Sequence, residues 1–328
     1  MKRTVALAIA AMLAATGSAS AQEKFTFALN WFAVGDHAAY WVALDKGYYK
    51  AKGLDVTLEN SKGSGDSMAK VDTGRADAGL ADVAAVVPFL SKGGTIKVVG
   101  MVFDKTPLNI FSLKGKPLTK PKDLEGASLG SPPGDAQRQV FPAFAKLTGI
   151  DAKKVTWVNI EPAAKIAALV EKRMDGVSDY TTGLPLYEKA GGKGNIVMMK
   201  WADFGFDLYA MSIMASAKTM KDKPKQLKAF LEASYMGWRD VMADPDAALA
   251  IQKKHVPELD LSTIKENMAM GLELMKTDQY RKGGIGSIDD KRMCASVDLM
   301  NNYMSMAKKV ECKDVYTQEF FTKVEMPK

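Results

Sequence analysis

NWFAVGDHAAYWVALDKGYYKAKGLDVTLE, residues 30–59, begins just after a strand-like run, FTFAL. Its residues 37–53 have the pattern of a helix that ends at a glycine, and LDVTLEN, residues 54–60, is typical of a strand. Strands that alternate with helices indicate a parallel sheet with both faces covered. This stretch therefore predicts an α/β fold, and the rest of the chain can be followed outward from it.

The alternation continues along the chain in two series. The first runs to about residue 104, and residues 105–123, with three prolines and many lysines, interrupt it. The second series occupies residues 126–200, a strand-like run follows at 204–216, and the remainder is helical. Two such series predict two lobes that face each other across a cleft, which can close on a small molecule.

The lobes can be assigned to ranges of the sequence. We expect residues 22–111 to form the first part of lobe I and residues 112–205 to form lobe II. The chain then returns to lobe I with residues 206–328, which include a crossing hinge strand and the C-terminal helices. Because ligands of open α/β sheets bind beyond the carboxyl ends of the strands, we expect the binding residues in the loops that follow the strands of both lobes.

Residues 1–21 have the composition of a secretory signal peptide. Two basic residues precede the short apolar run 5–15, and Ala19-Ser20-Ala21 forms a small-residue cleavage site. The apolar run is well under the ~18 residues of a membrane-spanning helix. We therefore expect export and cleavage after Ala21.

Composition excludes several classes of protein. The 328 residues are 47% hydrophobic and 25% charged, with a net charge of +7, which is ordinary for a globular protein. The lysines are scattered and are not interleaved with base-stacking aromatics, so no nucleic-acid partner is expected. Cys294 and Cys312 are the two cysteines, and in an exported protein they favour a disulfide over two reduced thiols. With no histidine near them and no CxxC motif, no metal site is expected.

The opening stretch and the segment KVDTGRADAGLAD resemble a known family. An Asn-Trp pair follows the first strand, then come a histidine, a helix with Gly-Tyr-Tyr, a Gly-Leu-Asp-Val strand and a Gly-x-x-Asp-x-Gly turn. This pattern is similar to the substrate-binding proteins of ABC importers for nitrate, sulfonates, taurine and thiamine pyrimidine precursors. The resemblance implies a two-lobed periplasmic binding protein fold with hinge strands. It also implies a periplasmic monomer that delivers a small solute to an inner-membrane ABC permease.

The same branch of the family includes eukaryotic enzymes that make the thiamine pyrimidine from their own histidine and pyridoxal phosphate, using iron. Those enzymes carry a lysine where this chain has Ala81, and a cysteine cluster where this chain reads FGFDLYAMSIMAS, residues 204–216. A Schiff base needs an amine and an iron site needs ligands. No GxSxG, HExxH or P-loop motif is present either. We therefore expect no enzyme activity and no cofactor.

The aromatic residues of the opening stretch divide into two groups by position. Asn30 and Trp31 end the first strand at the expected cleft, where the indole can stack on a flat ring and the amide can both donate and accept. His37 begins the helix near the same loop and is a further candidate. Tyr40 and Trp41 lie inside the helix and are expected to pack it onto the sheet. The carboxylate before the helix, at position 36, is interpreted as a helix cap.

Other candidates for ligand contact follow strands in both lobes. The turns GSGD, residues 63–66, and GSPPGD, residues 130–135, open helices whose free N–H groups favour anions and polar oxygens. Asp179 and Tyr180 end a strand of lobe II, and Tyr180 is expected to form the second aromatic wall opposite Trp31. The full set of candidate ligand-binding residues is Asn30, Trp31, His37, Ser64, Asp82, Ser131, Gly134, Asp135, Asp179, Tyr180 and Tyr209.

Two kinds of solute are compatible with these residues. Aromatic walls favour a flat heteroaromatic ring, with a thiamine pyrimidine precursor as the first expectation and riboflavin-like or other aromatic solutes left open. The alternative is a sulfonate or a taurine-like organic anion held by the two helix N-termini.

Overall fold

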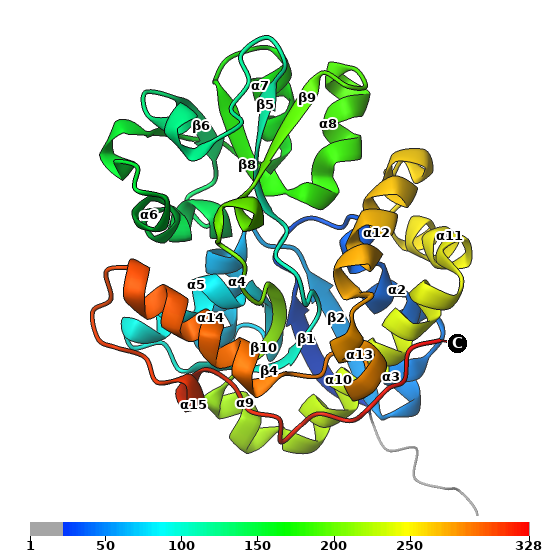
Figure 1. Cartoon of the computed structure of the whole chain (residues 1–328). Coiled ribbons are helices and arrows are strands. Elements are labelled where there is room, and N and C mark those ends of the chain that lie inside the picture. Colours follow the sequence, from blue (N-terminus) through cyan, green and yellow to red (C-terminus); the bar gives the residue numbers. More distant parts are fainter. Residues whose placement is uncertain (1–21, 328) are drawn as a thin grey trace, which may run out of the picture.

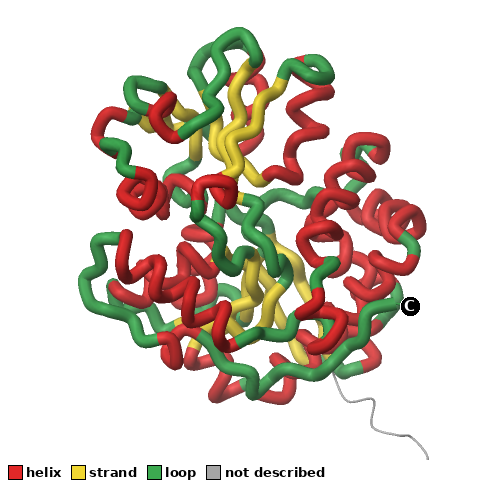
Figure 2. Tube along the Cα trace, viewed as in Figure 1, coloured by secondary structure: helices red, strands yellow, loops and turns green. Residues whose placement is uncertain are grey.

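The computed structural model describes residues 22–327 and contains two lobes, each built on a five-stranded sheet (Figure 1). The predicted signal peptide and its cleavage after Ala21 lie outside the described residues. Figure 2 shows each sheet lying between helices, as expected of an α/β fold. Within the described residues, no helix is long and apolar enough to cross a bilayer.

Lobe I is defined by the sheet with strand order β2-β1-β3-β10-β4. Its strands are β1 (Glu23–Ala28), β2 (Leu54–Glu59), β3 (Ala78–Asp82), β4 (Ile96–Met101) and β10 (Met211–Ser216). The helices of this lobe come from both ends of the chain: η1 (Gly35–His37), α2 (Ala38–Asp45), α3 (Tyr48–Ala51), α4 (Ser64–Asp72), α5 (Val83–Ser91), α9 (Ala217–Asp222), α10 (Pro224–Ala243), α11 (Pro245–His255), α12 (Leu261–Met275), α13 (Asp278–Gly283), α14 (Asp290–Tyr303) and α15 (Cys312–Val315).

Lobe II is defined by the sheet with strand order β7-β6-β8-β5-β9. Its strands are β5 (Leu108–Leu113), β6 (Ser128–Ser131), β7 (Thr156–Asn159), β8 (Gly176–Tyr180) and β9 (Ile196–Lys200). The helical segments between and after them are η2 (Pro121–Leu124), α6 (Ala136–Thr148), η3 (Ala152–Lys154), η4 (Pro162–Ala164), α7 (Lys165–Val170), η5 (Thr181–Gly183), α8 (Leu184–Gly191) and η6 (Trp201–Phe204).

One strand in each sheet runs against its neighbours, which corrects the expectation of purely parallel sheets. β10 is antiparallel to β3 and β4, and β5 is antiparallel to β8 and β9. The prolines and lysines of residues 105–123 predicted a break between the two series. β5 lies within this range, pairs with strands on both sides and is buried along most of its length. The boundary expected after residue 111 therefore falls inside β5, and the chain crosses to lobe II over residues 102–107.

The return crossing is shorter as a strand than the sequence indicated. Only Met211–Ser216 of the predicted run 204–216 is a strand. The residues before it are held by an aromatic cluster in which Trp201, fully buried, stacks on Phe144 of α6 with ring centroids 4.3 Å apart. Phe206 meets the edge of Trp201 at 5.4 Å. Apolar packing rather than strand pairing thus positions this crossing.

The two helix aromatics expected to pack on the sheet behave differently. Tyr40 is fully buried against Phe27, with ring centroids 4.8 Å apart, as the helical spacing predicted. Trp41 is only half-buried and stacks on His255 of α11 at 5.5 Å, beside a surface groove. It therefore joins two helices and does not fill the core of lobe I.

Cys294 of α14 and Cys312 at the start of α15 form a disulfide bond, with 5.1 Å between their Cα atoms. We expect no free thiol in the oxidised, denatured protein. The loop is short, so replacing both cysteines by serine should lower the free energy of unfolding by up to about 3 kcal/mol in the chain-entropy model. Thiol titration and denaturant unfolding measure the two effects, and two titratable thiols in the untreated protein would contradict the pairing.

Candidate functional site

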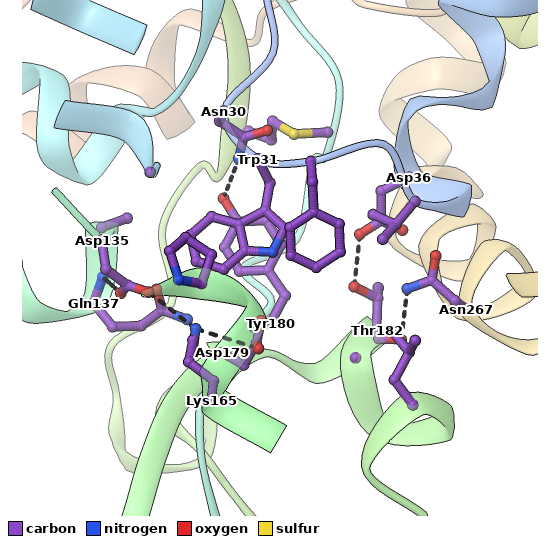
Figure 3. A pocket seen from close by; sticks show the side chains of 18 of the residues that line it. Asn30, Trp31, Asp36, Asp135, Gln137, Lys165, Asp179, Tyr180, Thr182 and Asn267 are labelled. Carbon is purple, nitrogen blue, oxygen red and sulfur yellow. Dashed lines mark hydrogen bonds and ion pairs between the residues drawn. The ribbon is translucent and has the colours of Figure 1, made fainter. Parts of the chain in front are cut away.

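A cavity lies between the two lobes, lined by residues from both (Figure 3). Lobe I contributes the loop after β1, the N-terminus of α4 and Asn267 of α12. Lobe II contributes the N-termini of α6 and α7 and the segment from the end of β8 into α8. The free space is about 60 Å³, well below the roughly 150 Å³ of an engineered cavity that accepts benzene. A ring-sized solute therefore enters only when the lobes separate or side chains move.

A directed chain of hydrogen bonds crosses the cleft. The Val34 N–H donates to His37 Nδ1 at 3.4 Å, so the other ring nitrogen, Nε2, carries the proton and donates to Asn30 Oδ1 at 3.0 Å. Asn30 Nδ2 donates to the hydroxyl of Tyr180 at 3.3 Å, and that hydroxyl donates to Asp82 Oδ2. Burial lowers the pKa of His37 to about 3, so the imidazole is neutral in this chain.

Asp36 makes a second link between the lobes. Its carboxylate accepts from the Thr182 hydroxyl at 2.7 Å, and Asn267 Nδ2 of α12 donates to the Thr182 carbonyl at 2.8 Å. Burial raises the pKa of Asp36 to about 7. The interpretation of Asp36 as a helix cap was wrong, because no side-chain cap bond forms at η1 and the carboxylate faces the other lobe.

Lys165, at the start of α7, lies at the centre of lobe II's side of the cavity. Its side chain is 1% exposed, and its Nζ is 3.2 Å from both Asp135 Oδ2 and Asp179 Oδ2. Burial alone would lower the pKa of Lys165, but the two carboxylates raise it above its ordinary value. Nζ also lies 4.6 Å from the centre of the Trp31 ring. Lys165 is therefore an ammonium ion that touches the aromatic wall of the opposite lobe.

Most of the predicted site residues are brought together. Seven of them line the cavity: Asn30, Trp31, His37, Ser64, Asp135, Asp179 and Tyr180. Asp82 lies just behind Tyr180, and burial raises its pKa to about 7. Ser131 also lies behind the wall, where its hydroxyl accepts from Ser178 at 2.9 Å.

Gly134 serves contact between the lobes. Its carbonyl accepts from the Gly65 N–H of α4 at 3.0 Å. A Cβ at Gly63 would stand 2.3 Å from that carbonyl oxygen, and Gly63 has φ +119°. Glycine is required at position 63 on both counts, because a side chain would push the two helix N-termini apart.

Tyr209 does not belong to the cavity, which corrects its place among the candidates. Its hydroxyl accepts from the Asp289 N–H at 2.8 Å, and Arg292 of α14 lies over its ring at 5.3 Å. Arg292 also contacts Asp104 and Asp207, which lie on the two crossing segments. Tyr209 therefore helps to hold the two crossing segments against α14. It lies on a hinge segment but does not line the cleft.

The sequence missed Lys165, Thr182, Gln137 and Asn267, which also line the cavity. One signal could have found Lys165, because it is the single charged residue in PAAKIAALV, residues 162–170. No local pattern distinguishes the other three from ordinary polar residues of helices and turns.

The two α/β lobes, the crossing segments and the cavity between the lobes are the features of the two-lobed periplasmic binding protein fold. Residues 34–248 match the model of the family described as "NMT1/THI5 like", and the chain belongs to that family. The fold is shared with the alkanesulfonate-binding protein SsuA from Xanthomonas axonopodis pv. citri bound to MOPS. The TM-score is 0.69 at 13% identity, over 92% of this chain and 99% of that one.

Three relatives show the range of the family. The riboflavin-binding protein RibY of Chloroflexus aurantiacus is 24% identical over 91% of this chain and 86% of its own. A formylaminopyrimidine-binding protein of Halalkalibacterium halodurans is 23% identical, covering 80% and 81%. A 4-amino-5-hydroxymethyl-2-methylpyrimidine phosphate synthase of Uromyces fabae is 24% identical, covering 73% and 72%. These relatives thus include both binding proteins and a protein named as a synthase.

Proposed function

We propose that this protein is the solute-binding subunit of an ABC importer and that its solute is a flat heteroaromatic molecule, with a thiamine pyrimidine precursor as the first candidate. The observation that carries the proposal is the half-buried indole of Trp31 in a cavity whose lining combines apolar side chains with polar groups from both lobes. Such an arrangement fits a ring with polar substituents at its edge. The lobes close on the solute, and the closed form delivers it to an inner-membrane permease. The protein is exported to the periplasm, cleaved after Ala21, and acts as a monomer.

The charges of the cavity argue against the alternative solute, a sulfonate or taurine-like anion. Three carboxylates line it, those of Asp36, Asp135 and Asp179. Lys165 is the one lysine among the described lining residues, and it is already paired with two of them. The amides at the N-terminus of α6 are also taken, because the Asp135 carboxylate accepts from two of them. An added anion would therefore meet negative charge and no unpaired cation.

A binding role is also supported over the synthase chemistry named for some relatives. Ala81, where those enzymes are expected to carry a lysine, is a fully buried residue of β3. Lys165 cannot take its part, because a lysine with a raised pKa stays protonated and an ammonium ion is not a nucleophile. Among residues 22–327, no group of three or more His, Cys, Asp or Glu side chains is placed to hold a metal ion.

Calorimetric titration tests this proposal. We expect 4-amino-5-hydroxymethyl-2-methylpyrimidine or its formylamino derivative to bind at least tenfold more tightly than taurine, since taurine gains neither ring stacking nor an unpaired cation. Mass spectrometry of small molecules released from gently purified protein should find an aromatic solute. Tighter binding of taurine would contradict the choice of solute, and steady turnover of a bound pyrimidine would contradict the binding role.

A further inference from the structure

We propose that Lys165 selects the solute by donating a charge-assisted hydrogen bond to an acceptor atom on the ring, so that the site takes heteroaromatic rings with a ring nitrogen or carbonyl oxygen and rejects rings without one. This inference rests on the proposed function. It adds the residue that reads the ring edge and the chemical feature that it reads.

The geometry around the ammonium leaves one of its three protons for a ligand. Two protons are directed to Asp135 Oδ2 and Asp179 Oδ2, each 3.2 Å from Nζ. The third has only the face of the Trp31 ring, whose centre is 4.6 Å away. A solute that stacks on this face of Trp31 lies beside the ammonium, because Nζ is only 4.6 Å from the centre of the ring in the closed form. The solute's edge then meets the third proton.

The parts of this arrangement belong to different lobes. Asp135, Lys165 and Asp179 all belong to lobe II, whereas Trp31 belongs to lobe I. Opening the cleft therefore breaks the contact between Lys165 and Trp31 but leaves the ammonium held by its two carboxylates. Lobe I would offer the stacking platform and lobe II a preorganised donor, and closure would bring both onto the ring, which lowers the entropic cost of binding.

The two carboxylates do not depend on the ammonium for all of their hydrogen bonds, although its charge offsets the repulsion between them. Asp135 already caps α6 through the Gln137 and Arg138 amides, and it accepts from the Ser178 hydroxyl at 3.2 Å. Asp179 accepts from the Tyr187 hydroxyl at 2.8 Å. Both carboxylates thus have other partners, while burying a lysine charge is costly even when it is paired. Contact with the ligand would explain why the charged ammonium of Lys165 is buried at the cavity.

The test compares two rings on two proteins. The probes are 4-amino-5-hydroxymethyl-2-methylpyrimidine and the benzene analogue with the same substituents, in which both ring nitrogens are replaced by CH. In the unmodified protein the analogue should bind about 10- to 100-fold more weakly, the range of a charge-assisted hydrogen bond. In Lys165→Met the pyrimidine should fall to the level of the analogue, so that the two rings bind within about threefold of each other.

Lys62→Met is the matched control, because Lys62 pairs with Glu161 across the lobes at 2.8 Å but is largely exposed at the rim. It changes the charge equally and should keep the preference for the pyrimidine. The comparison of the two rings on the unmodified protein needs no variant, so it can be made even if Lys165→Met fails to fold. Equal binding of the two rings there overturns the role of Lys165. It leaves the proposed function intact.

Two further outcomes would also overturn the assignment. A Lys165→Met protein that folds and still prefers the pyrimidine shows that another residue reads the ring edge. The other outcome is that Lys165→Met binds the amino-bearing benzene more tightly than the unmodified protein does. That result shows that ligands displace the ammonium. If neither ring binds the unmodified protein, the pyrimidine proposal fails, and the assignment fails with it.

Discussion

Raising the pH from 5 to 8 should lower the free energy of unfolding of the unliganded protein by about 3–4 kcal/mol. The cause is a pair of buried carboxyls of lobe I, Asp36 and Asp82, which accept hydrogen bonds from Thr182 and Tyr180 of lobe II. Burial raises the pKa of Asp36 and of Asp82 from an ordinary 3.8 to about 7. A carboxyl with a raised pKa contributes stability that is fully present below about pH 4 and is lost as the pH rises to about 7. Between pH 5 and 7 the contribution of each carboxyl to the free energy of unfolding falls by about 3 kcal/mol.

Other buried groups near these carboxyls set the net effect. Burial lowers the pKa of His37 to about 3, so its contribution has the opposite sign and adds about 2 kcal/mol between pH 5 and 6.5. Burial also raises the pKa of Asp135, although Lys165 opposes the shift, so Asp135 acts in the same direction as Asp36. The pKa of Lys165 is raised and does not enter this range. The carboxyls therefore outweigh the histidine.

Denaturant unfolding at pH 5, 6.5 and 8 measures this effect, and isosteric variants assign it. Asp82→Asn keeps an oxygen to accept from Tyr180, and it should remove the contribution of one carboxyl, which leaves a net loss of about 1 kcal/mol. The double variant with Asp36→Asn should show no loss, and its stability should rise between pH 5 and 6.5 because His37 then dominates. Asp240→Asn is the control, because its ion pairs hold the pKa of Asp240 below its ordinary value and the loss should persist. A flat profile for the unmodified protein would contradict the buried state of both carboxyls.

Trp31→Ala should weaken binding of the heteroaromatic solute by roughly five- to 150-fold, with little change in melting temperature. Stacking of a ring on an aromatic side chain contributes about 1–3 kcal/mol in nucleic-acid sites, and each ~1.4 kcal/mol is tenfold in affinity. Trp31 is half-buried in the cavity wall, and its ring neighbours are Phe32, 5.5 Å away, and the ammonium of Lys165. Its removal therefore opens no large hole in a core. Tyr180 is proposed as the opposite wall of the ring.

Trp41→Ala is the matched control for this variant. Both residues are half-buried tryptophans of the same short stretch, but Trp41 stacks on His255 outside the cavity. It should bind the solute normally and melt lower, by less than a fully buried tryptophan such as Trp201 would cause. If Trp31→Ala binds the solute normally and melts far lower, Trp31 is a packing residue and the ring lies elsewhere.

Much of the fold could be predicted because it depends on local pattern. The period of apolar residues distinguishes helix from strand over ten residues or fewer, and glycines and prolines mark where elements end. β5 was missed because its neighbours in sequence carry prolines and lysines that look like a loop, while its partners β8 and β9 come more than sixty residues later. The burial that makes it a strand comes from those partners.

The α/β class, the two-lobed plan and the place of Trp31 just after the first strand could be predicted from residues close together in the chain. The chemistry of the cleft could not, because it depends on residues that are distant in sequence. Asp36 meets Thr182 across 146 positions, Asn30 meets Tyr180 across 150, and Lys165 meets Asp135 across 30. The folding of the two sheets and the closure of the lobes set these distances, as well as the burial that raises the pKa of one group and lowers that of another. No local pattern carries that information.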